Sequence, residues 1–155
     1  MNTDRNILDT TVGIRYNIDV IVLDTEGNEL RRERVHNILT TAGKNWIRDR
    51  INGNEADALT HFAGGTGTTA VAVGDTAMET ETFRAAWTSF TDSAAQTVYQ
   101  YLLPAGSNNG TTFTEGGSFD AASGGTLFNH FLYTAIAKTS SIQILFQVTL
   151  TIAEA

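Results

Sequence analysis

The chain has 155 residues, which suits one domain large enough to bury a core of its own. It contains no cysteine, which excludes disulfides, thiolate metal sites and a cysteine nucleophile. Seventeen acidic residues against ten Lys and Arg give a net charge of −7, which argues against electrostatic binding to nucleic acid or to an anionic membrane. The sequence shows neither a spanning apolar run nor a signal-peptide pattern, so we expect a soluble protein without an export route.

Positive charge is unevenly distributed along the chain. Residues 1–57 hold eight of the ten cations, whereas residues 58–155 hold only Arg84 and Lys138. Thr, Ala, Gly, Asn and Gln replace the Lys and Glu that usually cover a soluble monomer. Surfaces buried against partners are depleted in Lys and Glu as well. The pattern therefore indicates either a component of a larger assembly, or a biased genome or saline habitat.

The first third of the chain predicts an arm followed by a hairpin. Residues 1–12 show no periodicity and are typical of an arm, which precedes a single domain over residues 13–155. Apolar residues alternate with polar ones over residues 14–22, which predicts a half-buried strand. Residues 24–28 are typical of a turn, and residues 29–37 form a second candidate strand. Together with the first strand they predict a hairpin.

One segment has a helical pattern. Residues on one stripe of a helix over about 41–52 are apolar: Ala42, Trp46, Ile47 and Ile51. Thr40 or Thr41 can cap its start, and Asn52-Gly53 supplies a left-handed stop. We predict a short amphipathic helix that plugs an open end of the β-structure, and a second single helical turn over residues 75–81.

The rest of the chain predicts further short strands separated by glycine-rich turns. The candidates are residues 58–63, 83–91, 97–103, 127–136 and 142–152, with a weaker one between 111 and 119. The last of these runs is the clearest, because six apolar residues alternate along it. Seven or eight strands with regular turn signals are typical of an antiparallel sandwich. We therefore predict an all-β protein, an antiparallel β-sandwich with a jelly-roll-like winding.

Polar residues that could carry chemistry do not form a recognisable catalytic or metal-binding pattern. The histidines His36, His61 and His130 lack ligand spacing and are interpreted as ordinary strand residues. The glycine-rich residues 64–69 lack the lysine of a phosphate-binding loop, so we interpret them as a turn that needs several positive φ angles.

The acidic residues could support glycoside hydrolysis only if a cleft and aromatic residues accompanied them. The two groups are Glu115 with Asp120, and Asp75 with Glu79 and Glu81; we interpret them as acids in surface turns. No serine lies in a nucleophile elbow. The sequence thus predicts no catalytic residue, no cofactor and no metal.

Two features could mark a contact with another protein. Arg31, Arg32 and Arg34 form a dense charge run with Glu29 and Glu33. The run could bind an acidic partner, or it could protect an edge strand from unwanted pairing. Tyr99, Tyr101 and Tyr133 would mark a contact surface if they are exposed, although core packing is the default expectation.

Three stretches together resemble a family of virion proteins from tailed bacteriophages and related viruses. Residues 35–43 (VHNILTTAG) are similar to the family's entry into a short helix. Residues 60–69 (THFAGGTGTT) and 73–78 (VGDTAM) resemble its Thr-Gly-Thr-Thr and Gly-Asp-Thr-Ala-Leu segment. The third stretch resembles its closing series, with NG at 109–110, EGGSF at 115–119, GGTL at 124–127 and IAKT at 136–139.

The resemblance implies a structural role without catalytic residues. Proteins of this kind are head decoration (cement) proteins, or tail-fibre and baseplate components. We expect a capsid decoration protein on the outer surface of the head, assembled in the host cytoplasm, that bridges major capsid subunits as a homotrimer. The expected contacts are Ile7, Leu8, Arg31, Arg32 and Arg34. The alternatives are a tail-fibre or baseplate component, and a carbohydrate-binding module, which would need a platform of exposed aromatic residues.

Overall fold

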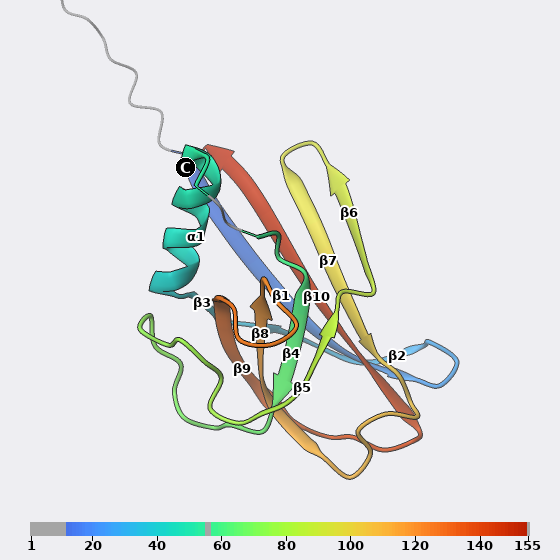
Figure 1. Cartoon of the computed structure of the whole chain (residues 1–155). Helices are drawn as coiled ribbons and strands as arrows, with labels where there is room; N and C mark the ends of the chain where they lie inside the picture. The colour runs from blue at the N-terminus through green and yellow to red at the C-terminus, as the bar shows by residue number, and fades with distance from the viewer. Residues whose placement is uncertain (1–11, 55–56, 155) are drawn as a thin grey trace, which may run out of the picture.

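The structure is a computed structural model that describes residues 12–54 and 57–154. Two antiparallel sheets of five strands pack face to face, with one helix beside them (Figure 1). The first sheet has the order β2-β1-β10-β7-β6, with β1 (Val12–Asp24), β2 (Glu29–Val35), β6 (Ser89–Ser93), β7 (Gln96–Leu103) and β10 (Ile142–Glu154). The second has the order β3-β9-β8-β4-β5, with β3 (Asn37–Leu39), β4 (His61–Gly65), β5 (Glu81–Ala86), β8 (Thr112–Phe119) and β9 (Leu127–Ala137). The predicted all-β sandwich is confirmed, and the jelly-roll winding stays a prediction.

The core lies between the inner faces of the two sheets. Along β1 and its partner β10, every second residue faces this core, and Val20 lies opposite Phe146 with both side chains fully buried. Phe62 of β4 is the central ring of the second sheet. Its centroid lies 4.4 Å from that of Phe146 and 5.3 Å from that of Tyr101, so rings from both sheets stack on one another.

Two runs that the sequence presents as single strands are each divided between the sheets. The run at 29–37 forms β2 in the first sheet and β3 in the second, with His36 between them. The run at 83–91 forms β5 and β6, which also belong to different sheets. At this second crossing the Trp87 N–H donates to the carbonyl of Thr60 beside β4, and the next N–H, that of Thr88, donates to Gln100 of β7. Neither run contains a glycine or a proline that would mark the crossing, which is why the sequence predicted one strand at each.

The helix α1 (Thr41–Asn52) begins and ends where the sequence predicts. The Thr40 hydroxyl accepts a hydrogen bond from the Gly43 N–H at 2.8 Å, and Gly53 ends the helix in the left-handed conformation with φ of 78°. Trp46 packs edge-on against Phe128 of β9, with 5.3 Å between ring centroids. However, Ile51 is 80% exposed, so the helix covers the end of the sandwich only in part.

Residues 66–80 form a long connection from β4 to β5 that packs on the outer face of the second sheet. Met78 lies there in a small cluster with Ala63, Phe119 and Leu127. The single helical turn predicted over residues 75–81 is wrong, because this stretch forms isolated bends and then enters β5. No helix in the described part of the chain is long and apolar enough to cross a membrane.

Candidate functional site

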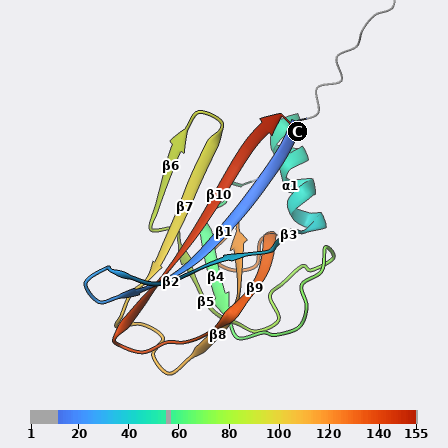
Figure 2. The ribbon, with the colours of Figure 1, turned by 180° about the vertical axis from the view of Figure 1, so that it is seen from behind.

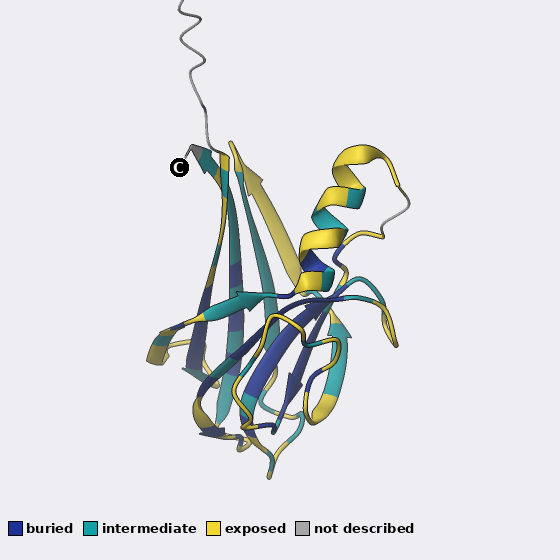
Figure 3. Cartoon of the chain, turned by 90° about the vertical axis from the view of Figure 1, so that its left-hand side faces the viewer, coloured by how far each residue is buried: buried dark blue, intermediate teal, exposed yellow. Residues whose placement is uncertain are grey.

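The first sheet extends beyond the second at one end of the sandwich, and no described residue covers its inner face there. Along β1, Ile18 is fully buried, Ile14 is 40% exposed and Val12 is 61% exposed, although all three point to the same face. In β10, Val148 is fully buried and Ile152 is 49% exposed. Figure 3 shows the buried residues gathered in the lower half, with the upper ends of these strands intermediate or exposed. We call this region the open end.

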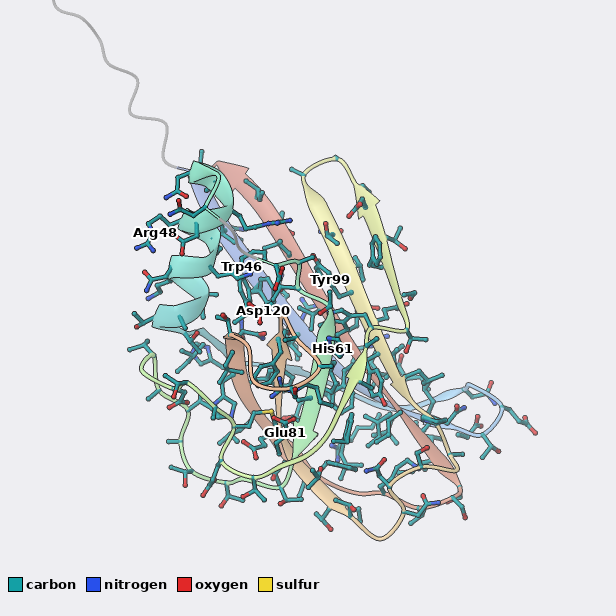
Figure 4. The ribbon with its side chains drawn as sticks, viewed as in Figure 1. Trp46, Arg48, His61, Glu81, Tyr99 and Asp120 are labelled. Carbon is teal, nitrogen blue, oxygen red and sulfur yellow. The ribbon has the colours of Figure 1, made fainter. Side chains whose placement is uncertain are left out.

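A groove of about 580 Å³ lies at the open end, between α1 and the β6–β7 hairpin. Four aromatic side chains from four segments line it, namely Trp46, Trp87, Phe90 and Tyr99, and we call it the aromatic groove. In Figure 4, Trp46 lies on the side of the helix that faces the sheet, with Tyr99 across from it on β7. The ring of Tyr99 lies 5.4 Å from Trp87 and 6.4 Å from Phe90, so three of the rings form a continuous row.

The aromatic groove carries charges of both signs at its rim. The guanidinium of Arg50 lies 5.6 Å from the centroid of the Trp46 ring, a cation–π distance. On the opposite wall, the Asp92 carboxylate accepts a hydrogen bond from the Thr97 hydroxyl at 2.7 Å. Burial raises the pKa of Tyr99, the Asp92 charge adds to this effect and Arg50 opposes it. One cation and one anion thus leave the site close to neutral.

An aliphatic surface adjoins the aromatic groove where β1 begins and β10 ends. Its exposed members are Val12, Ile14, Ile51 and Ile152, and we call it the terminal patch. A smaller hollow of about 180 Å³ runs beside α1 and is lined by three of these four residues together with Ile47 and Leu150. Because apolar surface gathers here rather than being scattered singly, the terminal patch has the character of a protein contact.

A buried polar network holds residues 66–80 against the second sheet. His130 of β9 places Nε2 at 2.9 Å from Glu115 Oε2 and Nδ1 at 2.7 Å from Asp75 Oδ2. Glu115 is fully buried, so its interpretation as a surface acid is wrong. His130 is the hydrogen-bonded strand histidine that the sequence predicts. The histidine therefore ties the loop carboxylate to the strand carboxylate.

The backbone N–H groups of this loop bind carboxylates of the chain itself. Glu115 accepts hydrogen bonds from Gly67, Glu79 and Thr80, at 2.9, 3.1 and 2.7 Å. Glu79 in turn accepts the N–H groups of Thr68 and Thr69. These amides are therefore not open to a phosphate. The N–H groups of this segment bind carboxylates of the chain, so they do not form the hydrogen bonds of a helix.

The glycines of this region are needed for space rather than for positive φ angles. A Cβ atom at Gly65 would lie 2.5 Å from Glu115 Oε1, and one at Gly67 would lie 2.6 Å from it. Neither glycine has a positive φ, so the expected series of positive φ angles is wrong. The close approach lets the backbone wrap around the buried carboxylate.

The network also sets the pKa of two acids. For Asp75, burial is the largest single effect and raises the pKa, but the hydrogen bond from the Ala72 N–H and the hydrogen-bond and charge interactions with His130 together outweigh it and lower the pKa. For Glu79, the hydrogen bonds from the N–H and hydroxyl of Thr69 lower the pKa, against a smaller effect of burial. Both groups are thus stabilised in their ionised form.

The pair Glu115 and Asp120, considered for hydrolysis, occupies two different settings. Asp120 accepts a hydrogen bond from the Thr126 N–H at 2.6 Å, in a turn between β8 and β9, whereas Glu115 is enclosed under the loop. Glu81 pairs with Arg84 at 2.7 Å. Within residues 12–54 and 57–154, no group of three or more His, Asp or Glu side chains is arranged to hold a metal ion.

The three predicted contact arginines lie on β2, an edge strand of the first sheet (Figure 2). All three are ion-paired within the chain: Arg32 with Glu29 at 2.7 Å, Arg34 with Asp19 at 2.9 Å and Arg31 with Glu33 at 3.6 Å. This placement fits the edge-protecting interpretation, and their role as partner contacts stays a prediction. The other two contacts, Ile7 and Leu8, lie outside the described residues.

The predicted tyrosines divide between core and surface. Tyr133 is buried, Tyr101 is half-buried against the core, and Tyr99 lines the aromatic groove. Sequence reasoning missed the groove because its rings come from separate segments. The terminal patch did leave a signal, because the apolar alternation of β1 and β10 continues to residues that nothing described covers.

Comparison with known proteins adds no relative. No protein family, no curated protein and no solved structure matches this chain. The resemblance to virion proteins therefore rests on the residues quoted for it in the sequence.

Proposed function

We propose that this chain is a virion structural protein, a small capsid decoration protein that binds the outer shell of the head and bridges major capsid subunits. The terminal patch is the observation that carries the proposal. It places exposed aliphatic side chains at one end of a sandwich whose core is otherwise enclosed. An apolar surface of this kind is costly to expose to water and is typical of a surface that another protein covers.

The distribution of charge supports the same role. Residues 58–155 carry only two cations, which fits a protein that stands outside the genome chamber rather than against nucleic acid. We propose that the protein acts as a homotrimer. Three identical contacts on one rigid body bind neighbouring subunits far more tightly than one contact does, because the second and third contacts form within the same complex.

The copy number of the chain in purified particles tests this function. About one copy per major capsid subunit, or one trimer per local three-fold position, is expected for a protein that covers a shell. A few copies per particle would overturn the decoration role and favour the alternative, a tail-fibre or baseplate component. Complete absence from particles would overturn both.

A matched pair of variants tests the terminal patch. We expect the double variant Ile14→Ser, Ile152→Ser to be lost from particles, since two hydroxyls would replace apolar contacts there. Leu30→Ser is the control, because Leu30 is 60% exposed but lies beyond the first hairpin turn at the start of β2. Equal incorporation of both variants would contradict the assignment of this surface.

A further inference from the structure

We infer that the aromatic groove is a carbohydrate-binding site for a neutral oligosaccharide. The inference does not depend on the proposed virion role. It rests on the composition, charge and rigidity of the groove, which are separate from the terminal patch that carries the proposed function.

The shape and the lining of the groove fit a small organic ligand. Its volume of about 580 Å³ lies within the usual range of ligand sites, which are mostly apolar with a few placed polar groups. Trp87, Phe90 and Tyr99 offer ring faces in a row, with Trp46 on the opposite wall. A sugar ring presents a face of C–H groups that packs on an aromatic face, and its hydroxyls point outward from its edge.

One polar group at the rim, the Asp92 carboxylate, can accept a hydrogen bond from a ligand. Asp92 is exposed, and its Oδ1 accepts the Thr97 hydroxyl. Within the described part of the chain, Oδ2 of Asp92 has no hydrogen-bond partner. A sugar hydroxyl can donate to this oxygen. A proline-rich peptide, which also packs on aromatic rings, offers carbonyl acceptors but no N–H at its prolines.

The charge of the groove argues against ionic ligands. Among the described residues that line the groove, only Arg50 and Asp92 are ionised, and they carry opposite charges on facing walls. A phosphate or a nucleic acid would need an excess of cations, and a basic peptide would need an excess of acids. A neutral polyhydroxylated ligand matches this balance.

Contacts within the chain hold the two tryptophan rings of the groove in place. The Trp46 Nε1–H donates to the carbonyl of Asp57 at 2.8 Å, while its ring packs against Phe128. Trp87 lies 5.6 Å from Phe62, the central ring of the core, and 5.4 Å from Tyr99. A preformed site loses less conformational entropy on binding. The groove therefore has the rigidity of a binding site rather than of a loose surface.

Tryptophan fluorescence provides a direct assay, because the chain has two tryptophans and both line the groove. The probes are neutral cello-, malto-, manno- and chito-oligosaccharides, titrated into the full chain. We expect at least one of them to shift the emission with a saturating dependence on concentration. The absence of a saturable shift with all four classes would overturn the inference.

Two variants locate the site. Phe90→Ala and Asp92→Asn should each weaken binding about tenfold or more, which corresponds to ~1.4 kcal/mol. Both side chains are exposed, so the fold should survive, and circular dichroism checks this. Val73→Ala is the control, because Val73 is 53% exposed but lies in the 66–80 loop. Equal affinity in all three variants would place the sugar elsewhere and overturn the inference.

Two further experiments separate this inference from a peptide-binding role of the groove and from the proposed function. A proline-rich peptide that bound in place of every sugar would overturn the carbohydrate assignment. The terminal-patch variant Ile14→Ser, Ile152→Ser should lose incorporation into particles while it keeps oligosaccharide binding. Phe90→Ala should do the reverse, so the failure of one proposal leaves the other standing.

Discussion

Glu115 of β8 and His130 of β9 face each other beneath the 66–80 loop, with 2.9 Å between Oε2 and Nε2. Glu115 is fully buried, yet three backbone N–H groups and one imidazole nitrogen surround its two oxygens. A buried carboxylate persists in a protein when such partners replace the water that it loses. The pair therefore anchors the 66–80 loop to the second sheet through hydrogen bonds.

Glu115→Gln should destabilise the protein strongly. The amide would turn an NH₂ group toward N–H donors and leave at least one of them without an acceptor in a buried site. We expect a loss of about 3 kcal/mol in the free energy of unfolding, measured by urea denaturation. Glu26→Gln is the control, because the Glu26 side chain is exposed in the first hairpin turn. A similar loss in both variants would contradict the anchoring role.

Acid should weaken the attachment of the same loop. The folded-state pKa values of Asp75 and Glu79 are lowered from ordinary values of 3.8 and 4.5. Each group therefore contributes stability that is complete above its unfolded pKa and is lost as the pH falls through its folded pKa. We expect the melting temperature to fall as the pH drops below about 4.5.

The contribution of Asp75 can be isolated by substitution. Asp75→Asn cannot ionise, so its melting temperature should be lower than that of the wild type near neutral pH and should decline less on acidification. Other acids with lowered pKa, such as Asp24 and Glu29, titrate equally in both proteins. Parallel curves for variant and wild type would show that Asp75 contributes nothing to the acid response.

Substitutions of Phe62 and Phe90 by alanine should differ sharply in their effect on the free energy of unfolding. Phe62 is fully buried among rings of both sheets, whereas Phe90 is 67% exposed at the aromatic groove. Phe62→Ala should cost about 4 kcal/mol, because it removes apolar contacts and leaves a cavity. Phe90→Ala should change the free energy of unfolding by less than about 0.5 kcal/mol, as for surface substitutions away from special features. Thermal unfolding of the two variants measures the difference.

Local patterns predicted the individual elements well. The strands β1 and β10 follow from alternation within each run, and the helix bounds follow from Thr40 and Gly53, whose effects act within a few residues. The division of the runs at 29–37 and 83–91 was not predictable in this way. Alternation states which residues share a face, but it does not state which sheet provides the hydrogen bonds.

The candidate sites depend on contacts between distant segments, which is why the sequence showed less of them. The sequence predicted a surface acid at Glu115 because its partners lie 15 to 48 residues away along the chain. The aromatic groove requires α1, the β5–β6 crossing and β7 to meet at one end. The three arginines predicted as contacts lie on a charged strand, as expected, but the ion pair of Arg34 with Asp19 of β1 emerges only from the folded structure.

Lys138 is a buried cation, and its contribution to stability can be tested in the same way as that of the buried acids. It is one of two lysines in the chain, and its ammonium group is buried among neutral oxygens. Nζ donates to the carbonyls of Ala105 and Thr139 and to the side-chain oxygen of Asn109, at 2.9 to 3.0 Å. Burial lowers its pKa, so the charged form is held at a cost that these three acceptors offset.

Lys138→Met should therefore loosen the turn that joins β7 to β8. Hydrogen bonds to a charged donor contribute more than neutral ones, and we expect a net loss of about 2 kcal/mol. The exposed Lys44→Met is the matched control and should change little. Hydrogen exchange reports the local effect through the amides of Ser107 and Gly110, which donate to Pro104 and to the Lys138 carbonyl. Unchanged exchange at both amides in Lys138→Met would mean that the ammonium group does not hold this turn.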